Sequence, residues 1–139
     1  RIIQIKDQSE NDLRKAINFA IKDKVDDIRI IGATGKREDH TIGNIFSLIN
    51  YKSLKMKIFT DTGFFRSIDK DKKIKSFKGQ QVSIFSLDRT IKVSSKYLKY
   101  NFNKNIISSL YSGTLNESTG TYFEIKLSHG SIIVFQTYK

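Results

Sequence analysis

The 139-residue sequence has no cysteine, proline or tryptophan, and it has only two histidines, His40 and His129. Without cysteine the chain cannot form a disulfide scaffold, a zinc–cysteine centre, an iron–sulfur cluster or a thiol nucleophile. The shortage of histidine argues against a metal site built from several histidines. No apolar run approaches the roughly 20 residues that a membrane-spanning helix requires, so the sequence predicts no such helix.

Negative charge is also scarce: the sequence has 25 lysines and arginines but only 14 aspartates and glutamates, which gives a net charge of +11. This balance favours an anionic partner, whether nucleic acid, a phosphorylated small molecule or an acidic membrane surface. The acids are more frequent in the first half of the chain, where a metal–phosphate site would need them. The densest basic stretch, residues 70–78, is interpreted as a solvated loop and strand edge.

Residues 1–66 alternate between strand and helix patterns. Strands are predicted over residues 2–6, 28–31 and 56–60, and a helix is predicted over 41–50. An earlier helix begins near Asp12, where apolar residues recur at the spacing of one helical face. The order strand–helix–strand–helix–strand predicts parallel strands with right-handed crossovers, as in an α/β domain.

Residues 67–139 follow a period of two instead, which is typical of strands with one buried face. No strong helix pattern interrupts them, so this half is predicted to be an antiparallel β-sandwich or roll. His129 and Gly130 are interpreted as a two-residue hairpin loop before a strand at 132–135. No proline-rich linker separates the halves, so we expect them to pack tightly across a boundary near residues 62–70.

Polar residues follow the first two predicted strands. Ligands bind open parallel sheets beyond the carboxyl ends of the strands, where the loops containing Asp12 and Arg37 are expected to converge. Carboxylates there suit Mg²⁺, and a guanidinium suits phosphate. The glycines of residues 32–40 and a helix N-terminus near Thr41 also favour an anion. The pattern therefore predicts phosphoryl-type transfer.

Structural roles account for the same residues and stay open at this point. Asp12 and Asp39 could cap helices, Arg37 could be a surface cation, and His40 could be a capping residue. The loop is not a Walker A motif, because only two residues separate Gly32 from Gly35, whereas four separate the two glycines of that motif. In the second half, aromatic and small polar residues at 97–102 and 114–118 could bind a flat heterocycle, or could be core and turn residues.

Together these segments resemble the thiamine pyrophosphokinase family. The first motifs are Asp7-Gln8, Asn11-Asp12-Leu13, and 35–40 with Asn44. Segments 81–87, 98–100 and 116–118 follow in the family's order. The likeness covers nearly the whole chain and is closest to bacterial members of the Bacteroidetes type.

The resemblance implies an α/β catalytic domain, here residues 1–66, followed by an all-β thiamine-binding domain, residues 67–139. It implies a cytoplasmic homodimer without nucleic-acid or membrane partners. The enzyme would use Mg²⁺ to transfer the pyrophosphoryl group of ATP to the hydroxyl of thiamine, which gives thiamine diphosphate and AMP.

The resemblance also assigns roles to individual residues. The catalytic residues would be Asp12, Arg37 and Asp39. The residues that bind ATP and its pyrophosphate would be Gln8, Thr34, Gly35, Arg37 and His40. Asp7 and Asp12 would bind Mg²⁺, and the thiamine ligands would be Tyr100, Thr114, Asn116 and Ser118.

Several positions depart from the family's pattern. Asn11 replaces the usual threonine, Tyr97 replaces a glycine, and Leu115 replaces a serine. Upstream Asp-Gly and Gly-Asp-x-Asp-Ser motifs, which supply further Mg²⁺ ligands in the family, do not occur in these residues. We therefore expect that an N-terminal portion is missing and that this polypeptide alone is inactive. The alternative functions are a basic β-rich nucleic-acid-binding module and a noncatalytic thiamine-binding protein.

Overall fold

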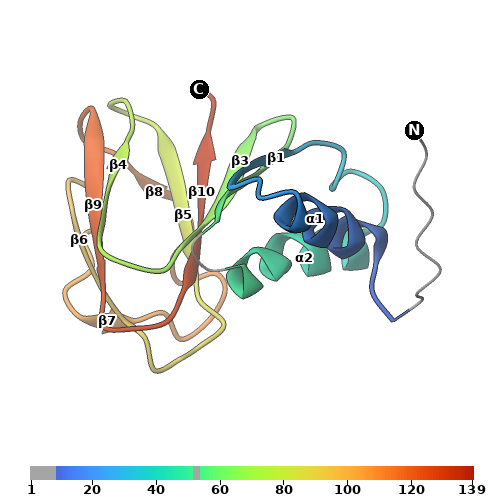
Figure 1. Ribbon diagram of the computed structural model, residues 1–139. Coiled ribbons are helices and arrows are strands. Elements are labelled where there is room, and N and C mark those ends of the chain that lie inside the picture. The colour runs from blue at the N-terminus through green and yellow to red at the C-terminus, as the bar shows by residue number, and fades with distance from the viewer. Residues whose placement is uncertain (1–8, 52–53) are drawn as a thin grey trace.

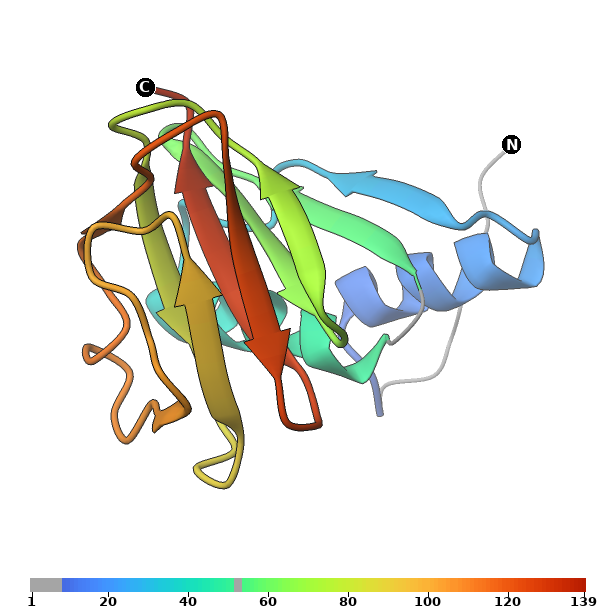
Figure 2. The same ribbon diagram turned by 90° about the vertical axis from the view of Figure 1, so that its left-hand side faces the viewer.

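The helices and the two β-sheets of the chain form three layers, which lie side by side in Figure 1. Figure 2 is turned so that the sheet on the left of Figure 1 faces the viewer. The computed structural model describes residues 9–51 and 54–139. The strand predicted over residues 2–6 therefore lies outside the described residues, as do Asp7 and Gln8. Neither α-helix within the described residues is long and apolar enough to cross a membrane.

The first helix, α1 (Asp12–Lys22), begins where the sequence predicts. Its N-cap is Asn11, whose side chain accepts a hydrogen bond of 2.9 Å from the backbone N–H of Arg14. Asp12 is therefore a first-turn residue and not the cap. This leaves its carboxylate free of a capping bond.

The second helix, α2 (Glu38–Ser47), begins three residues earlier than predicted and continues into a short 3₁₀ turn, η1 (Leu48–Asn50). Arg37 has the extended backbone of an N-cap, and two acids in the first turn match the positive end of the helix dipole. The strands on either side of it, β1 (Asp27–Ile30) and β2 (Lys55–Phe59), pair in parallel, as predicted.

Strand β3 (Gly63–Ile68) pairs antiparallel with β2 and extends the parallel pair into a six-stranded sheet. The order of that sheet is β1-β2-β3-β10-β5-β8, which adds β5 (Gln81–Phe85), β8 (Asn116–Glu117) and β10 (Ile132–Thr137). The second sheet has the order β4-β9-β6-β7, with bounds Lys72–Lys75, Tyr122–Leu127, Lys92–Lys96 and Asn105–Ile106. The predicted α/β part and β-sandwich are thus confirmed.

Strand β10 contributes to both hydrophobic cores. Ile132 and Val134 belong to the core between the two sheets, whereas Ile133 packs with Ile17 and Met56 on the helical side. Successive side chains of a strand point to opposite faces, which explains the split. The α/β part and the sandwich therefore share one sheet.

The hairpin predicted at residues 129–130 is wrong. Strand β9 pairs with β4 and β6, whereas β10 pairs with β3 and β5, so the loop between β9 and β10 crosses from one sheet to the other. Gly130 has a φ of 72° and lies so close to Ile91 that an added Cβ would come within 2.7 Å of it. Local sequence resembles a hairpin turn, but hydrogen bonds to distant strands set the path of the chain.

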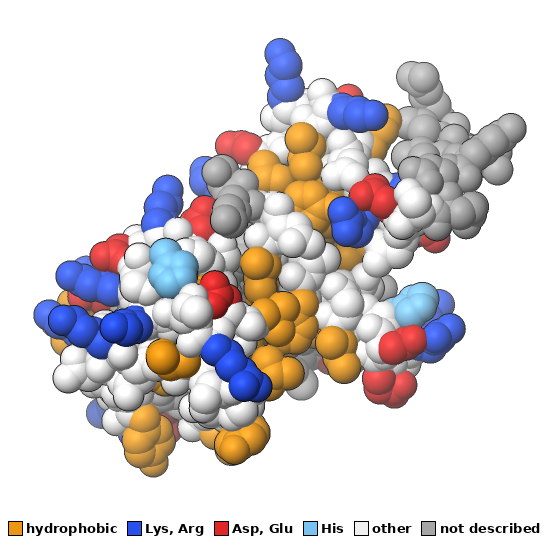
Figure 3. All heavy atoms as spheres, turned by 90° about the horizontal axis from the view of Figure 1, so that it is seen from below, with side chains coloured by type: hydrophobic (Ala, Val, Ile, Leu, Met, Phe, Trp, Pro, Cys, Tyr) orange, Lys and Arg blue, Asp and Glu red, His pale blue; other side chains and the backbone are white. Residues whose placement is uncertain are grey.

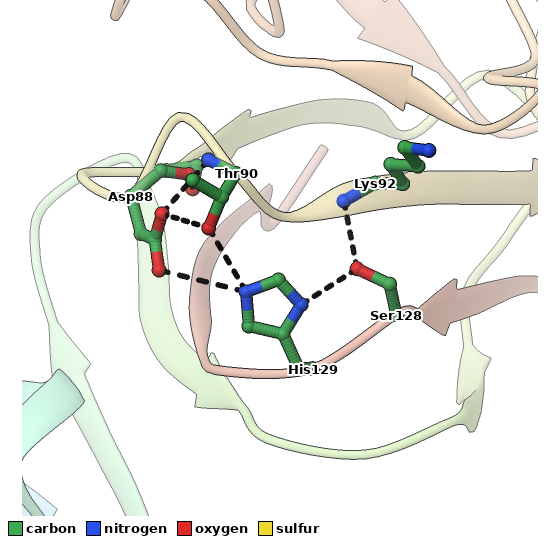
Figure 4. Close-up of polar contacts among 6 residues, drawn as sticks. Asp88, Thr90, Lys92, Ser128 and His129 are labelled. Carbon is green, nitrogen blue, oxygen red and sulfur yellow. Dashed lines mark hydrogen bonds and ion pairs between the residues drawn. The ribbon is translucent and has the colours of Figure 1, made fainter.

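His129 fastens this loop to the turn before β6, as Figure 4 shows. The hydroxyl of Thr90 lies 2.6 Å from Asp88 Oδ1 and 3.0 Å from His129 Nε2, and Ser128 Oγ lies 2.9 Å from His129 Nδ1. Ser128 Oγ in turn accepts a bond of 3.0 Å from the backbone N–H of Lys92. Each polar group has a partner in this chain of bonds, which holds two exposed loops together.

Candidate functional site

The N-terminus of α1 and the loop after β1 meet at a cavity of about 550 Å³. Asn11 and Asp12 line it from the helix, and Gly32 and Ala33 line it from the loop. The sequence predicts this meeting, because each segment follows the carboxyl end of a predicted strand. The structure thus brings Asp12 to the loop that leads to Arg37.

Asn44 connects the two segments from α2. Its Oδ1 accepts a bond of 3.3 Å from the side chain of Asn11, and its Nδ2 donates a bond of 2.9 Å to the backbone oxygen of Ala33. His40 lies one helical turn before it and lines the same cavity. Two signals in the sequence point to this link, namely the spacing of His40 and Asn44 on one helix face and the place of Asn44 in the family resemblance.

A second cavity, of about 210 Å³, adjoins the first along the loop 32–37. Thr34, Arg37 and His40 line it, so three of the predicted ATP ligands lie around one space. Gly35 does not itself line the cavity, but its φ of 89° lets the loop turn into the start of α2. The loop and the helix N-terminus together form a surface that suits an anion.

Arg37 and Asp39 form a two-pronged ion pair, with Nε 3.1 Å from Oδ1 and Nη2 2.6 Å from Oδ2. The guanidinium of Arg37 and the backbone N–H of His40 hold the pKa of the Asp39 carboxyl below its usual value of 3.8. Asp39 lines neither cavity. This geometry makes Asp39 the residue that orients Arg37.

The fit of Mg²⁺ rests on the carboxylates near the larger cavity. The Asp12 side chain is fully exposed, with one oxygen 3.5 Å from Lys15 Nζ. Glu10 is held by Arg14 at 3.0 Å and by Asn18 at 2.9 Å. Within residues 9–51 and 54–139, no cluster of three acidic or histidine side chains could hold a metal ion. Asp12 therefore suits Mg²⁺ as one ligand of a larger set.

Two of the predicted thiamine ligands turn their polar groups to the protein itself. The Asn116 side chain is 3% exposed and exchanges two hydrogen bonds with the backbone of Tyr100, of 3.1 and 2.7 Å. Ser118 is fully buried, and its hydroxyl donates to the backbone oxygen of Gly120. The side chain of Asn116 thus fixes the backbone of Tyr100, and the backbone of Ser118 pairs with Leu98 in the same segment.

The other two predicted thiamine ligands reach the surface. Tyr100 is 63% exposed, and the half-buried Thr114 donates its hydroxyl to the backbone oxygen of Tyr111. Tyr97 and Leu115 both have positive φ, at 64° and 58°. The conformation at Tyr97 explains why a glycine would suit that position.

Two family models match the chain, one in each half. The model described as "Thiamin pyrophosphokinase, catalytic domain" matches residues 1–60, and "Thiamin pyrophosphokinase, substrate-binding domain" matches residues 63–135. The division falls immediately before β3. No curated protein matches the sequence.

Solved structures of similar fold cover nearly the whole chain. The thiamine pyrophosphokinase of Bacillus subtilis is 21% identical, with a TM-score of 0.80 over 94% of this chain and 64% of its own. The thiamin pyrophosphokinase of Geobacillus thermodenitrificans is 19% identical, with a TM-score of 0.81 over 96% and 64%. The yeast enzyme is 17% identical, with a TM-score of 0.66 over 96% and 49%. The chain thus spans less than two thirds of each of these relatives.

Proposed function

Because this chain belongs to the thiamin pyrophosphokinase family, we propose that it is part of an enzyme that transfers the pyrophosphoryl group of ATP to the hydroxyl of thiamine. The products are thiamine diphosphate and AMP. The observation that carries the proposal is the convergence of Asp12, Arg37 and His40 around two adjoining cavities at one edge of the sheet. The family match favours neither of the alternative functions.

The triphosphate of ATP binds along the loop 32–37 and the N-terminus of α2. Arg37 contacts the phosphate oxygens and neutralises the negative charge that develops as the pyrophosphoryl group moves. Asp39 acts as a positioning residue, because it already holds the guanidinium in a fixed plane. Thr34 and His40, which line the same cavity, orient the phosphates.

Bound Mg²⁺ would supply positive charge that offsets the negative charge of the phosphate oxygens. Asp12 would hold it, together with Asp7 and further carboxylates outside the described residues. Gln8, also outside them, would contact the triphosphate. The exposure of Asp12 on the cavity wall supports this role, since its carboxylate makes no helix-capping hydrogen bond that metal binding would have to break.

Thiamine binds in the sandwich, where the ring of Tyr100 stacks on it and Thr114 offers a hydroxyl. Asn116 and Ser118 support this binding surface through hydrogen bonds to backbone oxygens. A homodimer completes it, which is consistent with the exposure of Tyr111 and Leu115, at 80% and 82%. Apolar side chains also gather in the middle of the face shown in Figure 3. The cytoplasmic location expected from the sequence stays a prediction.

We propose further that the 139-residue chain alone does not catalyse the reaction. It spans 64% of the Bacillus subtilis relative, and Asp12 is the one carboxylate in its described residues that we assign to Mg²⁺. A kinase assay on this chain is expected to give no thiamine diphosphate. Full turnover would refute the proposal.

Calorimetric titration of the intact gene product tests the main proposal. Thiamine should release heat, and so should a nonhydrolysable ATP analogue with Mg²⁺. Arg37→Ala should abolish the nucleotide heat and keep the thiamine heat, whereas Arg89→Ala, which removes an exposed cation of the β5–β6 turn, should keep both. Heat with neither ligand, or undiminished nucleotide binding by Arg37→Ala, would contradict the proposal.

A further inference from the structure

A third groove, of about 340 Å³, lies where the two sheets diverge. One wall is the face of β1, β2 and β3 that points away from the helices, and the other is the segment leading into β4. The groove reaches the amino ends of β1 and β2, whereas the nucleotide cavities lie beyond their carboxyl ends. Its charged lining residues are Asp27, Arg29, Lys55, Lys57, Arg66, Asp69, Lys70 and Lys72.

The sheet places three cations of this groove in one row. Arg29 is directly opposite Lys57 in the parallel pair, and Lys57 is directly opposite Arg66 in the antiparallel pair. Like charges at directly opposed positions destabilise a sheet. The alternate residues Ile28 and Met56 face the helical core, so the charged residues lie on the opposite side from the helices that the structure describes.

Two of these cations form no ion pair with a described residue, although the nearby negative charge of Asp27 partly offsets that of Lys57. None of the ion pairs within residues 9–51 and 54–139 includes Lys57 or Arg66, although Arg29 lies 3.9 Å from Asp27. Arg66 donates one hydrogen bond to the neutral amide of Gln136, and its buried Nε has no partner among the described residues. Burial lowers the pKa of Arg66 to about 10. Both cations are half-buried, and a cation that is partly removed from water without an ion-pair partner is costly and requires an explanation.

Phe64 holds the two unpaired cations beside each other. Lys57 Nζ lies 5.0 Å from the centre of its ring, and the Arg66 guanidinium lies 5.2 Å from it. Cation–π contacts of this kind fix the positions of both charged groups before any ligand arrives. The row is thus preorganised for an anion.

Protection of a sheet edge does not account for the arrangement. Lysines on β4, an edge strand, discourage pairing with another chain, and Lys73 packs over the ring of Tyr122 at 3.6 Å. Arg66 and Lys57, however, lie on interior strands of the other sheet. Their row needs a separate reason.

We propose that this groove binds a small anion with two or three linked phosphate groups, at a site separate from the nucleotide cavities. Neighbouring strands lie about 4.8 Å apart, so a row across three strands spans roughly 10 Å, which suits a chain of phosphates better than a single one. Lys70 and Lys72 approach the same space from the opposite wall. This inference does not depend on the proposed pyrophosphokinase activity.

Titration with inorganic tripolyphosphate tests the proposal, using the 139-residue chain. Backbone amide NMR signals of residues 55–57 and 66–70 should shift on binding. Lys57→Gln should weaken this binding about tenfold, since it removes one charge-assisted contact. Lys78→Gln, which makes the same change of charge outside the groove, should stay within about twofold, and Arg37→Ala should leave these shifts unchanged.

Thermal unfolding gives a second readout that does not require a ligand-binding fit. Without tripolyphosphate, Lys57→Gln should melt at a higher temperature than the parent chain, because it removes like-charge repulsion with Arg66. With tripolyphosphate, its melting temperature should rise less than the parent's. The proposal is overturned if shifts occur only at residues 32–40, if Lys57→Gln binds as tightly as the parent, or if short single-stranded RNA shifts residues 55–57 and tripolyphosphate does not.

Discussion

At the scale of single residues, the structure separates side chains that line the candidate site from side chains that hold other residues in place. Arg37 lines a cavity, whereas Asp39 bonds Arg37 and lines none. Asn44 holds two loops together, and Asn116 holds the backbone of Tyr100. Motif positions therefore locate the region of the candidate site, and the hydrogen bonds of each side chain indicate its role within that region.

The Arg37–Asp39 pair predicts a pH dependence. Its hydrogen bonds place the pKa of Asp39 below the ordinary value of 3.8 in the folded chain. A carboxyl with a lowered folded pKa contributes stability above its unfolded pKa, and that contribution is lost as the pH falls through the folded pKa. The Asp39 carboxyl should therefore titrate below pH 3.8 in an NMR pH series.

Arg37→Gln should raise that midpoint toward the ordinary value of 3.8, while the hydrogen bond from the backbone N–H of His40 continues to lower it. Asp88 is the internal control, because hydrogen bonds from Thr90 lower the pKa of its carboxyl independently of Arg37. A midpoint of Asp39 that does not respond to Arg37→Gln would show that the ion pair is absent in solution.

Lys24 carries a second prediction at this scale. It has a φ of 60° just after α1, where the backbone N–H groups of Lys24 and Val25 bond to the oxygens of Ile21 and Ala20. This is the Schellman ending, which favours glycine. Lys24→Gly should raise the free energy of unfolding by roughly 0.5–1 kcal/mol, because it removes left-handed strain.

Urea denaturation measures that change, and Lys22→Gly is the matched variant. Lys22 is the last residue of α1, so glycine there should lower the free energy of unfolding by about 1 kcal/mol. Equal losses from both substitutions would contradict the assigned helix ending.

At the scale of elements, close backbone approach makes Gly113 a critical position. An added Cβ would overlap the backbone oxygen of Ile84, and the backbone N–H of Ile84 donates a bond of 2.7 Å to the oxygen of Gly113. Gly113→Ala should therefore lower the free energy of unfolding by roughly 2–3 kcal/mol or more. Gly120→Ala has only one neighbouring atom, at 4.0 Å, and should change it by less than about 1 kcal/mol. Similar thermal melts of the two variants would argue against the close contact.

The sequence predicts elements better than it predicts their partners. The helix at Asp12, the strands and the parallel pair all follow from local periodicity and caps. Strand β9 alternates between apolar and polar residues, whereas β10 begins with an apolar run at residues 132–135, which indicates burial on both faces but does not reveal the strands with which β10 pairs. The meeting of the Asp12 and Gly32 segments is predicted from two parallel strands, of which the first lies outside the described residues. The link through Asn44 depends on side-chain directions that spacing alone does not fix.

At the scale of the whole molecule, the shared sheet couples the two halves of the chain. Ile133 is fully buried on the helical side of β10, while its neighbours Ile132 and Val134 fill the sandwich core. We therefore expect one cooperative unfolding transition.

Ile133→Ala tests this coupling. It should lower the free energy of unfolding by about 2–5 kcal/mol and should shift the helical circular dichroism and the tyrosine fluorescence transitions together. Tyr97 and Tyr122, whose rings lie 5.0 Å apart in the sandwich, supply the second signal. Loss of the helical signal well before the tyrosine signal would show that the halves unfold separately.

The central claim is that two turns at one sheet edge jointly bind a metal-bound polyphosphate. Mapping of backbone amide shifts with a nonhydrolysable ATP analogue and Mg²⁺ tests it most directly. The account predicts changes at Asn11 and Asp12 and throughout residues 32–40 in the same titration, and predicts that Asn44→Ala weakens both sets. Shifts confined to one of the two segments, or found only elsewhere in the chain, would contradict it.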